Sequence, residues 1–280
     1  MWRFAGADRA SAARRVAAAL DIGCVLFDTA DIYGFGSASG FGGAEALLGE
    51  VFKADSSLRP RMVLATKAGI TPPTPYDSRA QHLIAACEAS LRRLGVETID
   101  LFQIHRPDLL AHPAEVASAL DQLRATGKIR EAGVSNYAAS QVEALREFLP
   151  FRLASVQPEF SALSIDPLSD GVLDQAMRLK LAVLAWSPLG QGRLGDVPCS
   201  SADTRTTAVL AVLDAVAARA GVSRSAVAYA WIIAHPARPV VLIGSQDPGR
   251  IRAAADAYSV RLEREEWYRI LAASRGAPMP

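Results

Sequence analysis

The sequence predicts an α/β fold of the (β/α)8 barrel class, formed by residues 1–280 as a single domain. Short apolar runs rich in β-branched residues alternate with stretches of helical periodicity, which is typical of parallel strands joined by crossover helices. The length of 280 residues fits the usual size of such a barrel. The glycine-rich segment 34–43 lacks the G-x-G-x-x-G spacing of a doubly wound dinucleotide-binding fold, so the barrel is the favoured architecture.

The predicted strands are short and apolar on both faces, as expected for strands covered by helices. They cover residues 25–27, 62–65, 99–104, 132–134, 153–156, 181–185 and 240–243. Residues 2–4, which begin with Trp2, are interpreted as the end of a further strand ahead of these. With that strand included, the sequence contains the eight βα units of a complete barrel.

Helical periodicity fills the intervals between these strands. The stretch 79–94 places its apolar side chains, from Leu83 to Leu94, on one stripe, and the stretch 113–126 begins with Pro113 and ends before a glycine. The predicted helices cover residues 10–20, 79–94, 113–126, 140–149, 173–179, 207–220, 223–234 and 248–257.

The composition argues against several classes of partner. Thirty Lys and Arg against 29 Asp and Glu give a formal net charge of +1, which offers no electrostatic grip on nucleic acid or an anionic membrane. No apolar run reaches the roughly 18–20 residues of a membrane span, and the first residues lack the order of a signal peptide. The cysteines at 24, 87 and 199 form no CxxC pair, so the predicted location is the reducing cytoplasm.

Polar or aromatic residues follow the predicted strands at the same end, where (β/α)8 barrels carry their chemistry. Taken alone, each has a structural explanation: Asp28 can cap a turn, Lys67 can be a solvated loop lysine, and His105 can be a hydrogen-bonded core histidine. Their common position after the strands instead predicts a ligand site. The strand-end residues are Asp28, Lys67, His105, Ser135, Asn136, Gln157, Trp186, Ser187, Gly244 and Ser245.

The residues alone leave more than one chemistry open at this site. A metal-dependent hydrolase needs several converging His, Asp or Glu ligands, and only His105 among the histidines stands at a strand end, so no metal is expected. A lysine such as Lys67 at a strand end is compatible with a Schiff base to a carbonyl substrate, as in an aldolase.

Five segments together resemble the aldo-keto reductase superfamily. Residues 27–34 (FDTADIYG) resemble the motif around its catalytic aspartate and tyrosine, 65–67 (ATK) its lysine strand, and 101–108 (LFQIHRPD) its histidine strand. Residues 127–137 (GKIREAGVSNY) and 185–190 (AWSPLG) match further motifs in the same order and at the same spacing. The end of the chain is most similar to a bacterial oxidoreductase branch of that superfamily.

The resemblance implies a (β/α)8 barrel that uses a nicotinamide cofactor to reduce aldehyde or ketone groups of small molecules to alcohols. It assigns Tyr33 as the general acid, with Lys67 favouring the phenolate. Asp28 would hold Lys67, and His105 would orient the carbonyl oxygen. The implied cofactor-binding residues are Ser135, Asn136 and Gln157 for the carboxamide, Trp186 for the nicotinamide ring, Ser187, Leu189 and Gly192 for the pyrophosphate, and Gly244, Ser245, Gln246 and Arg250 for the adenosine end.

Two departures from the family pattern affect these expectations. The chain starts at the tryptophan of the first strand, which implies a short or truncated N-terminus without the usual hairpin that closes the barrel floor. Gln246 and Asp247 stand where a positive residue often follows the last strand, which weakens the implied preference for a 2′-phosphate. The resemblance still favours NADP as the cofactor, with NAD as the alternative. Schiff-base chemistry at Lys67 and a non-catalytic, cofactor-sensing subunit remain the alternative functions. Substrate specificity is expected in the loops 35–42, 69–77 and 191–205.

Overall fold

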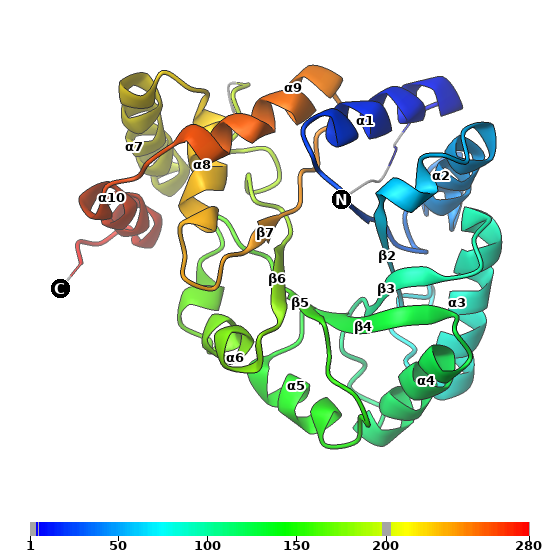
Figure 1. Ribbon diagram of the computed structural model, residues 1–280. Coiled ribbons are helices and arrows are strands. Elements are labelled where there is room, and N and C mark those ends of the chain that lie inside the picture. The colour runs from blue at the N-terminus through cyan, green and yellow to red at the C-terminus, as the bar shows by residue number, and fades with distance from the viewer. Residues whose placement is uncertain (1–3, 5, 198–202, 280) are drawn as a thin grey trace. The chain divides into compact units, whose positions relative to one another are not determined.

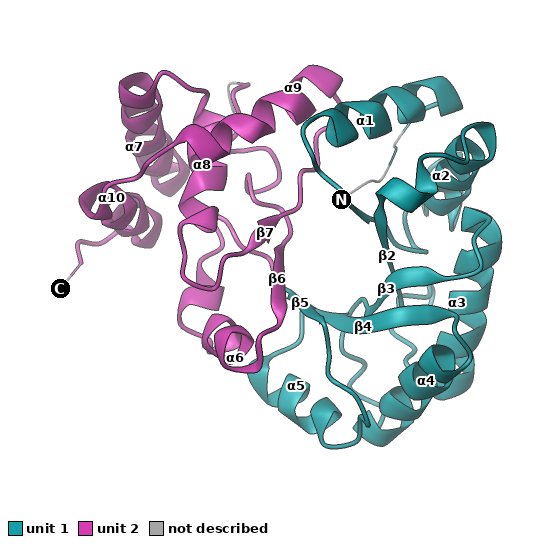
Figure 2. Cartoon of the chain, viewed as in Figure 1, with its two compact units in different colours: residues 1–157 teal, residues 158–280 magenta. Residues whose placement is uncertain are grey.

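The structure is a computed structural model that describes residue 4, residues 6–197 and residues 203–279. The chain forms two compact units, Met1–Gln157 and Pro158–Pro280, which Figure 2 shows in different colours. Phe4 is the described member of the strand expected at residues 2–4. Trp2, Arg3 and Cys199 lie outside the described residues.

The first unit carries parallel strands that pair in chain order. In the register, Phe27 lies opposite Leu64, and Lys67 lies opposite Gln103. Because parallel neighbours end at the same edge, the residues that follow these strands are brought together. The strands are β1 (Leu26–Asp28), β2 (Val63–Ala68), β3 (Ile99–Ile104), β4 (Ile129–Ser135) and β5 (Ser155–Gln157).

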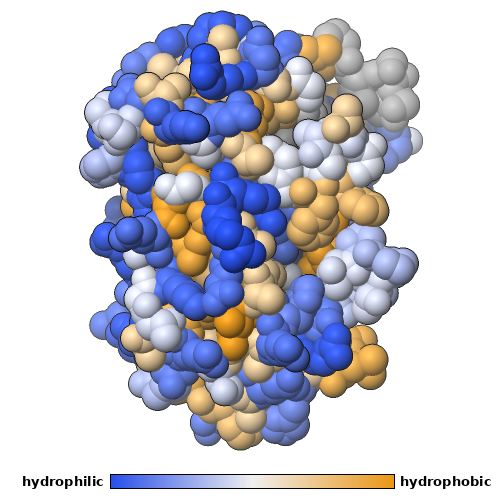
Figure 3. All heavy atoms as spheres, turned by 90° about the vertical axis from the view of Figure 1, so that its right-hand side faces the viewer, coloured by the Kyte–Doolittle hydropathy of each residue, from blue (hydrophilic) through white to orange (hydrophobic). Residues whose placement is uncertain are grey.

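Helices of the first unit flank these strands on their outer side (Figure 1). Asp8 caps the first of them by accepting a hydrogen bond from the Ser11 N–H at 2.7 Å, and Pro113 opens α4. In Figure 3, hydrophilic residues cover most of the face that carries the helices at the right of Figure 1, and hydrophobic ones form small separate groups. The helices are α1 (Arg9–Asp21), α2 (Gly43–Ala54), α3 (Ala80–Leu94), α4 (Pro113–Ala125) and α5 (Ala139–Arg146), with a 3-10 turn, η1, at Arg59–Arg61.

The second unit combines two parallel strands with a helical cluster. Trp231 and Trp267 stack with ring centroids 5.1 Å apart, and each indole N–H donates to the other residue's carbonyl, which locks two helices together. The strands are β6 (Ala182–Ala185) and β7 (Val240–Val241). The helices are α6 (Val172–Leu179), α7 (Thr204–Ala220), α8 (Arg224–Ile233), α9 (Pro248–Ala253) and α10 (Arg264–Arg275), and the 3-10 segments are η2 (Asp166–Leu168) and η3 (Ala254–Ser259).

The strands predicted from residue 25 onward are all present; β3 has the predicted bounds, and the others have shifted ends. β4 begins at Ile129, three residues earlier than predicted, because Ile129 pairs with Ile99 despite the charged residues that follow it. The sequence analysis missed α2 and α10. In α2, Gly49 lowers the helical propensity, yet the glycine is required because a Cβ there would lie 2.2 Å from the Arg93 carbonyl oxygen.

Among the described residues, no single helix is long and apolar enough to cross a membrane. α7 and α8 reach the length and composition of a span only when taken together, and they are bent by 98°. Within the same part of the chain, no group of three His, Cys, Asp or Glu side chains is placed to hold a metal ion.

Candidate active site

Lys67 and Asp28 form a buried ion pair at the carboxyl ends of neighbouring strands β2 and β1. The Lys67 Nζ lies 2.6 Å from the Asp28 Oδ2 and also donates to the Thr29 carbonyl oxygen at 2.6 Å. Both side chains are fully buried. A buried charge is tolerated only with a close partner and satisfied hydrogen bonds, and these contacts supply both to Lys67.

The environment of Lys67 keeps this side chain positively charged at neutral pH. Burial lowers the pKa of Lys67, but the charges and hydrogen bonds of Asp28 and Tyr33 outweigh it, so the pKa lies above its ordinary value. A fixed ammonium group therefore stands next to the phenol of Tyr33.

Tyr33 and His105 complete the group around the ion pair. The Lys67 Nζ lies 5.4 Å from the centroid of the Tyr33 ring, and the Tyr33 and His105 rings meet edge-on with centroids 5.9 Å apart. Tyr33 is placed by a turn after β1, in which its N–H donates to the Ala30 carbonyl at 3.1 Å. His105 follows β3, and its N–H donates to the Ala68 carbonyl at 2.8 Å. A phenol, an ammonium group and an imidazole thus lie together at the carboxyl ends of β1, β2 and β3.

Two glutamine side chains orient the Asp28 carboxylate. Gln103 and Gln157 donate to the Asp28 Oδ1 at 3.1 and 3.0 Å, opposite the oxygen that binds Lys67. Gln157 also donates to the Gln103 Oε1 at 3.2 Å. Asp28 is therefore held by three donors, one cation and two amides, and cannot rotate away from Lys67 without breaking several hydrogen bonds.

Ser135 and Asn136 extend the polar layer at the end of β4. Asn136 has a φ of 60°, a left-handed conformation that asparagine tolerates better than most residues. Its Nδ2 donates to the His105 carbonyl at 3.1 Å and to the Ser135 Oγ at 2.8 Å. Ser135 in turn donates to the Gln157 carbonyl at 3.1 Å. The strand ends of β3, β4 and β5 are thereby tied together by side chains.

In the second unit, Trp186 and Ser187 follow β6 at the start of a tight segment. Ser187 has a φ of 54°, and its Oγ accepts from the Gln191 N–H at 3.0 Å. Gly192 has a φ of 94°, and its N–H donates to the Leu189 carbonyl at 3.1 Å. Consecutive turns of this kind place the backbone of Ser187, Leu189 and Gly192 in one compact loop next to the half-buried Trp186.

The predicted adenosine-end residues lie before and within α9. Asp247 caps this helix by accepting from the Arg250 N–H at 2.8 Å, and the Ser245 Oγ accepts from the Asp247 N–H at 3.2 Å. Gln246 donates weakly to the Gly244 carbonyl at 3.5 Å. Because Asp247 already occupies the Arg250 N–H, an anion here would depend on the exposed Arg250 guanidinium rather than on that helix amide.

The structure brings together the predicted residues of the first unit: Asp28, Tyr33, Lys67, His105, Ser135, Asn136 and Gln157. Sequence reasoning missed Gln103, although a glutamine inside the apolar run 99–104 was a signal of a buried polar role. It also missed Asp31 in the turn after β1 and the ion pair of Glu45 in α2 with Arg93 in α3, which lie near β2.

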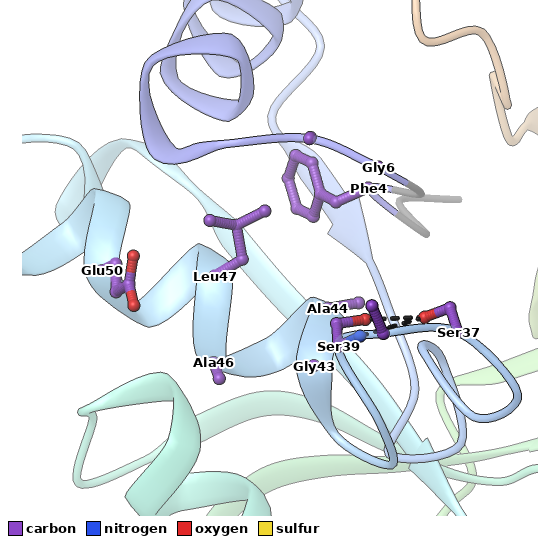
Figure 4. Close-up of a pocket in the computed structure, with 11 residues that line it drawn as sticks. Phe4, Gly6, Ser37, Ser39, Gly43, Ala44, Ala46, Leu47 and Glu50 are labelled. Carbon is purple, nitrogen blue, oxygen red and sulfur yellow. Dashed lines mark hydrogen bonds between the residues drawn. The ribbon is translucent and has the colours of Figure 1, made fainter.

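A separate pocket in the first unit has a volume of about 530 Å³. Figure 4 shows Phe4 and Gly6 on one side of it and Ser37 and Ser39 on another. Its lining is mostly small residues from the start of the chain, the glycine-rich segment and α2. None of the predicted site residues lines this pocket, so it is distinct from the group around Lys67.

The fold and the site define an α/β enzyme with an acid–base group at the carboxyl ends of parallel strands. The sequence model of the Aldo/keto reductase family matches residues 1–275, and the chain belongs to this family. A protein of Novosphingobium aromaticivorans described as "6-dehydroglucose reductase" is 54% identical over 100% of this chain and 91% of its own length. A protein of Agrobacterium fabrum with the same description is 37% identical over 96% of this chain and 91% of its own length.

A solved structure agrees with this assignment across the chain. The structure of a glycerol dehydrogenase from Gluconobacter oxydans has a TM-score of 0.85 and 30% sequence identity, and the match covers 100% of this chain and 90% of that one. The predicted α/β barrel class and the family resemblance are therefore confirmed. The chain is an oxidoreductase that reduces carbonyl groups of small molecules with a nicotinamide cofactor.

Proposed function

We propose that this protein reduces the aldehyde of a hexose oxidised at carbon 6 to the primary alcohol, with NADPH as the preferred cofactor. The observation that carries the substrate class is the 54% identity, over the full chain, to a protein described as a 6-dehydroglucose reductase. The chemistry of the site supports carbonyl reduction, because the buried Lys67–Asp28 pair beside Tyr33 suits protonation of a carbonyl oxygen.

Each residue of the group has a distinct part in this reaction. Tyr33 donates the proton to the substrate oxygen as negative charge develops there. The Lys67 ammonium favours loss of that proton because it stabilises the phenolate, and Asp28 keeps Lys67 charged and in place. His105, edge-on to Tyr33, orients the same oxygen with a hydrogen bond.

The side chains at the ends of β4 and β5 fit a nicotinamide cofactor. Hydroxyl and amide groups of Ser135, Asn136 and Gln157 gather there, which is the chemistry that binds a carboxamide. The cofactor supplies a hydride to the carbonyl carbon when bound. From the second unit, the proposal assigns cofactor binding to Trp186, Ser187, Leu189, Gly192, Gly244, Ser245, Gln246 and Arg250.

Schiff-base chemistry at Lys67 is disfavoured by the geometry around its amine. A nucleophilic amine must be neutral and must reach its substrate. The Lys67 Nζ instead bonds Asp28 and the Thr29 carbonyl, is fully buried, and has a pKa above its ordinary value.

A panel of carbonyl substrates tests the proposed function directly. Purified protein is assayed with 6-dehydroglucose, a small aldehyde such as methylglyoxal and a simple ketone, each with NADPH and with NADH. We expect the highest kcat/KM for 6-dehydroglucose with NADPH. Equal kcat/KM for all three carbonyls would contradict the hexose assignment, and trapping of substrate on Lys67 by borohydride without cofactor would contradict the reductase chemistry.

We expect Trp186→Ala to weaken binding of NADPH and NADH by roughly 2- to 13-fold, since a stacked aromatic ring contributes about 0.5–1.5 kcal/mol beyond its burial. Quenching of tryptophan fluorescence on cofactor addition measures this affinity in the wild type, and calorimetry measures it in the variant. Trp267→Phe is the matched control, because Trp267 stacks on Trp231 in the helical cluster. Unchanged affinity in Trp186→Ala would place the nicotinamide elsewhere.

We expect the wild type to prefer NADPH by about ten- to a hundred-fold, and Arg250→Ala to lose most of that preference. A charge-assisted hydrogen bond from Arg250 to the 2′-phosphate contributes roughly 1.5–3 kcal/mol, which outweighs repulsion by the exposed Asp247. Binding of NADH to the variant should stay near the wild-type value. Equal losses for both cofactors would show that Arg250 does not contact the 2′-phosphate.

A further inference from the structure

A second ion pair, with a fully buried carboxylate and a partly buried cation, lies next to β2, on the side of the strand that faces α2 and α3. Glu45 of α2 is fully buried and accepts from the Thr66 Oγ1 at 2.5 Å and from the Arg93 Nε at 2.7 Å. Arg93 of α3 also donates to the Ser90 Oγ at 3.1 Å. Thr66 directly precedes Lys67 in β2, so this pair adjoins the ion pair of the active site.

Arg93 also supports the glycine-rich segment 34–43 that follows Tyr33. A Cβ at Gly42 would lie 2.4 Å from the Arg93 Cδ, so the arginine packs directly on the backbone there. The Phe41 ring centroid lies 5.9 Å from the Arg93 Cζ. The segment is closed by hydrogen bonds, since the Ala44 N–H donates to the Tyr33 carbonyl at 3.1 Å. The Glu45–Arg93 pair therefore holds in place the segment 34–43, which directly follows Tyr33.

Asp31 is a third carboxyl group in this region, and it has no cation of its own. Its side chain is 1% exposed, and its Oδ1 has no hydrogen-bond partner. Lys67 is paired with Asp28, and Arg93 with Glu45. Among the described residues no basic group, Lys67 and Arg93 included, forms an ion pair with Asp31. Two carboxylates and two cations already balance, so a third buried negative charge would be uncompensated.

The groups around Asp31 act on its pKa in opposite directions, and the net effect is a rise. Burial, followed by the Glu45 carboxylate of α2, raises the pKa of Asp31 to about 8. Arg93 of α3, Lys67 of β2 and the Ile32 N–H oppose this rise without reversing it. The backbone of Asp31 meanwhile joins both parts of the site, because its N–H donates to the Lys67 carbonyl at 3.0 Å and its carbonyl accepts from the Gly42 N–H at 2.7 Å.

We propose that Asp31 is a positioning residue that stays a neutral carboxylic acid in the folded protein and thereby preserves the Glu45–Arg93 pair and the segment 34–43. An ionised Asp31 would repel the Glu45 carboxylate and attract the Arg93 guanidinium away from Glu45. Arg93 would then no longer pack against the backbone at Gly42. The segment that follows Tyr33 then loosens at alkaline pH. The kinetic part of this inference rests on the proposed reductase function, whereas the protonation state and the loosening do not.

The first experiment measures unfolding by urea between about pH 5 and pH 8 for the wild type and for Asp31→Asn, which is neutral at every pH. The folded wild type holds a proton that the unfolded chain releases above the ordinary carboxyl pKa near 4, so rising pH favours the unfolded state. We expect the ratio of the wild-type to the variant unfolding constant to rise by about tenfold per pH unit until about pH 8. Asp55→Asn is the matched control, because Asp55 is exposed and its pKa is lowered, so that it stays ionised over this range. The ratio of the wild-type to the Asp55→Asn unfolding constant should therefore not change with pH.

The second experiment measures protection of backbone amides by hydrogen exchange with mass spectrometry. We expect peptides that cover residues 34–44 of the wild type to lose protection between about pH 7 and pH 9, after correction for intrinsic exchange, and those of Asp31→Asn to keep it. Infrared spectroscopy of the wild type is an independent test of the protonation state of Asp31. The carbonyl band of the protonated carboxylic acid should disappear over the same pH range.

The third measurement is the pH dependence of KM and kcat for the reduced carbonyl substrate. We expect KM of the wild type to rise by about 2- to 30-fold relative to Asp31→Asn above about pH 8, with a smaller change in kcat, since coupling of this kind is worth about 0.5–2 kcal/mol. A pH-independent unfolding ratio, or equal loss of protection in both proteins, would overturn the inference. Parallel KM profiles would overturn the positioning role, whereas absence of any carbonyl reduction would overturn the proposed function and leave the first two measurements to decide on Asp31.

Discussion

Tyr33→Phe is expected to lower kcat for carbonyl reduction by roughly 10²–10⁴-fold, the usual contribution of a positioned general acid. The change removes one oxygen atom from a side chain that is 5% exposed, so packing around the ring is preserved. In the proposed mechanism the phenol acts on the substrate oxygen, whereas other side chains bind the cofactor. The dissociation constant of NADPH should therefore remain close to the wild-type value.

Single-turnover kinetics and a calorimetric titration separate these two quantities. Tyr229→Phe serves as the matched control, because Tyr229 is another buried tyrosine, placed in α8 of the second unit. Near-native single-turnover rates in Tyr33→Phe would show that another group protonates the substrate. A large loss of NADPH affinity would show that the phenol contributes to the cofactor site.

Lys67→Met is expected to reduce activity by at least about 10²-fold and also to destabilise the folded protein by roughly 3–5 kcal/mol. Methionine fills a similar volume, but it leaves the Asp28 carboxylate buried with only the two glutamine amides as donors. Removal of one partner from a buried ion pair is far more damaging than removal of both.

A double variant isolates that effect. Lys67→Met combined with Asp28→Asn removes both charges, and we expect it to recover a large part of the lost unfolding free energy while activity stays low. Urea unfolding at neutral pH measures the stability of the single and double variants. A double variant no more stable than Lys67→Met would show that the loss comes from packing rather than from the unpaired Asp28.

The pattern of strands and helices could largely be predicted from the sequence, because it depends on local chemistry. Short β-branched runs such as 99–104 predict buried strands wherever they occur, and β3 has the predicted bounds. Pro113 and Gly127 bracket α4 for stereochemical reasons that act within a few residues. Helix α2 was not readable in this way, since Gly43 and Gly49 lower its propensity and Gly49 is required by a neighbouring helix.

The catalytic candidates were also readable, because the polar residues Asp28, Lys67 and His105 stand directly after apolar runs. Parallel strands must end at a common edge, so a position in the sequence becomes a position in space once the sheet forms. Tyr33 was the exception, since it stands five residues beyond β1 and was assigned from the family resemblance alone. In the structure a turn brings its ring within 5.4 Å of the Lys67 Nζ.

The sequence by itself determined the barrel class, the family and the residues that stand at the strand ends, because propensity, periodicity and motif spacing are properties of neighbouring residues. Only the tertiary structure decided which charges meet. Glu45 and Arg93 lie 48 positions apart and Gln157 lies 129 positions from Asp28, yet each pair is joined by a hydrogen bond. The burial of a carboxyl group and the charges around it, which set its pKa, depend on these distant contacts. The raised pKa of Asp31 therefore follows from the tertiary structure and not from the neighbouring residues in the sequence.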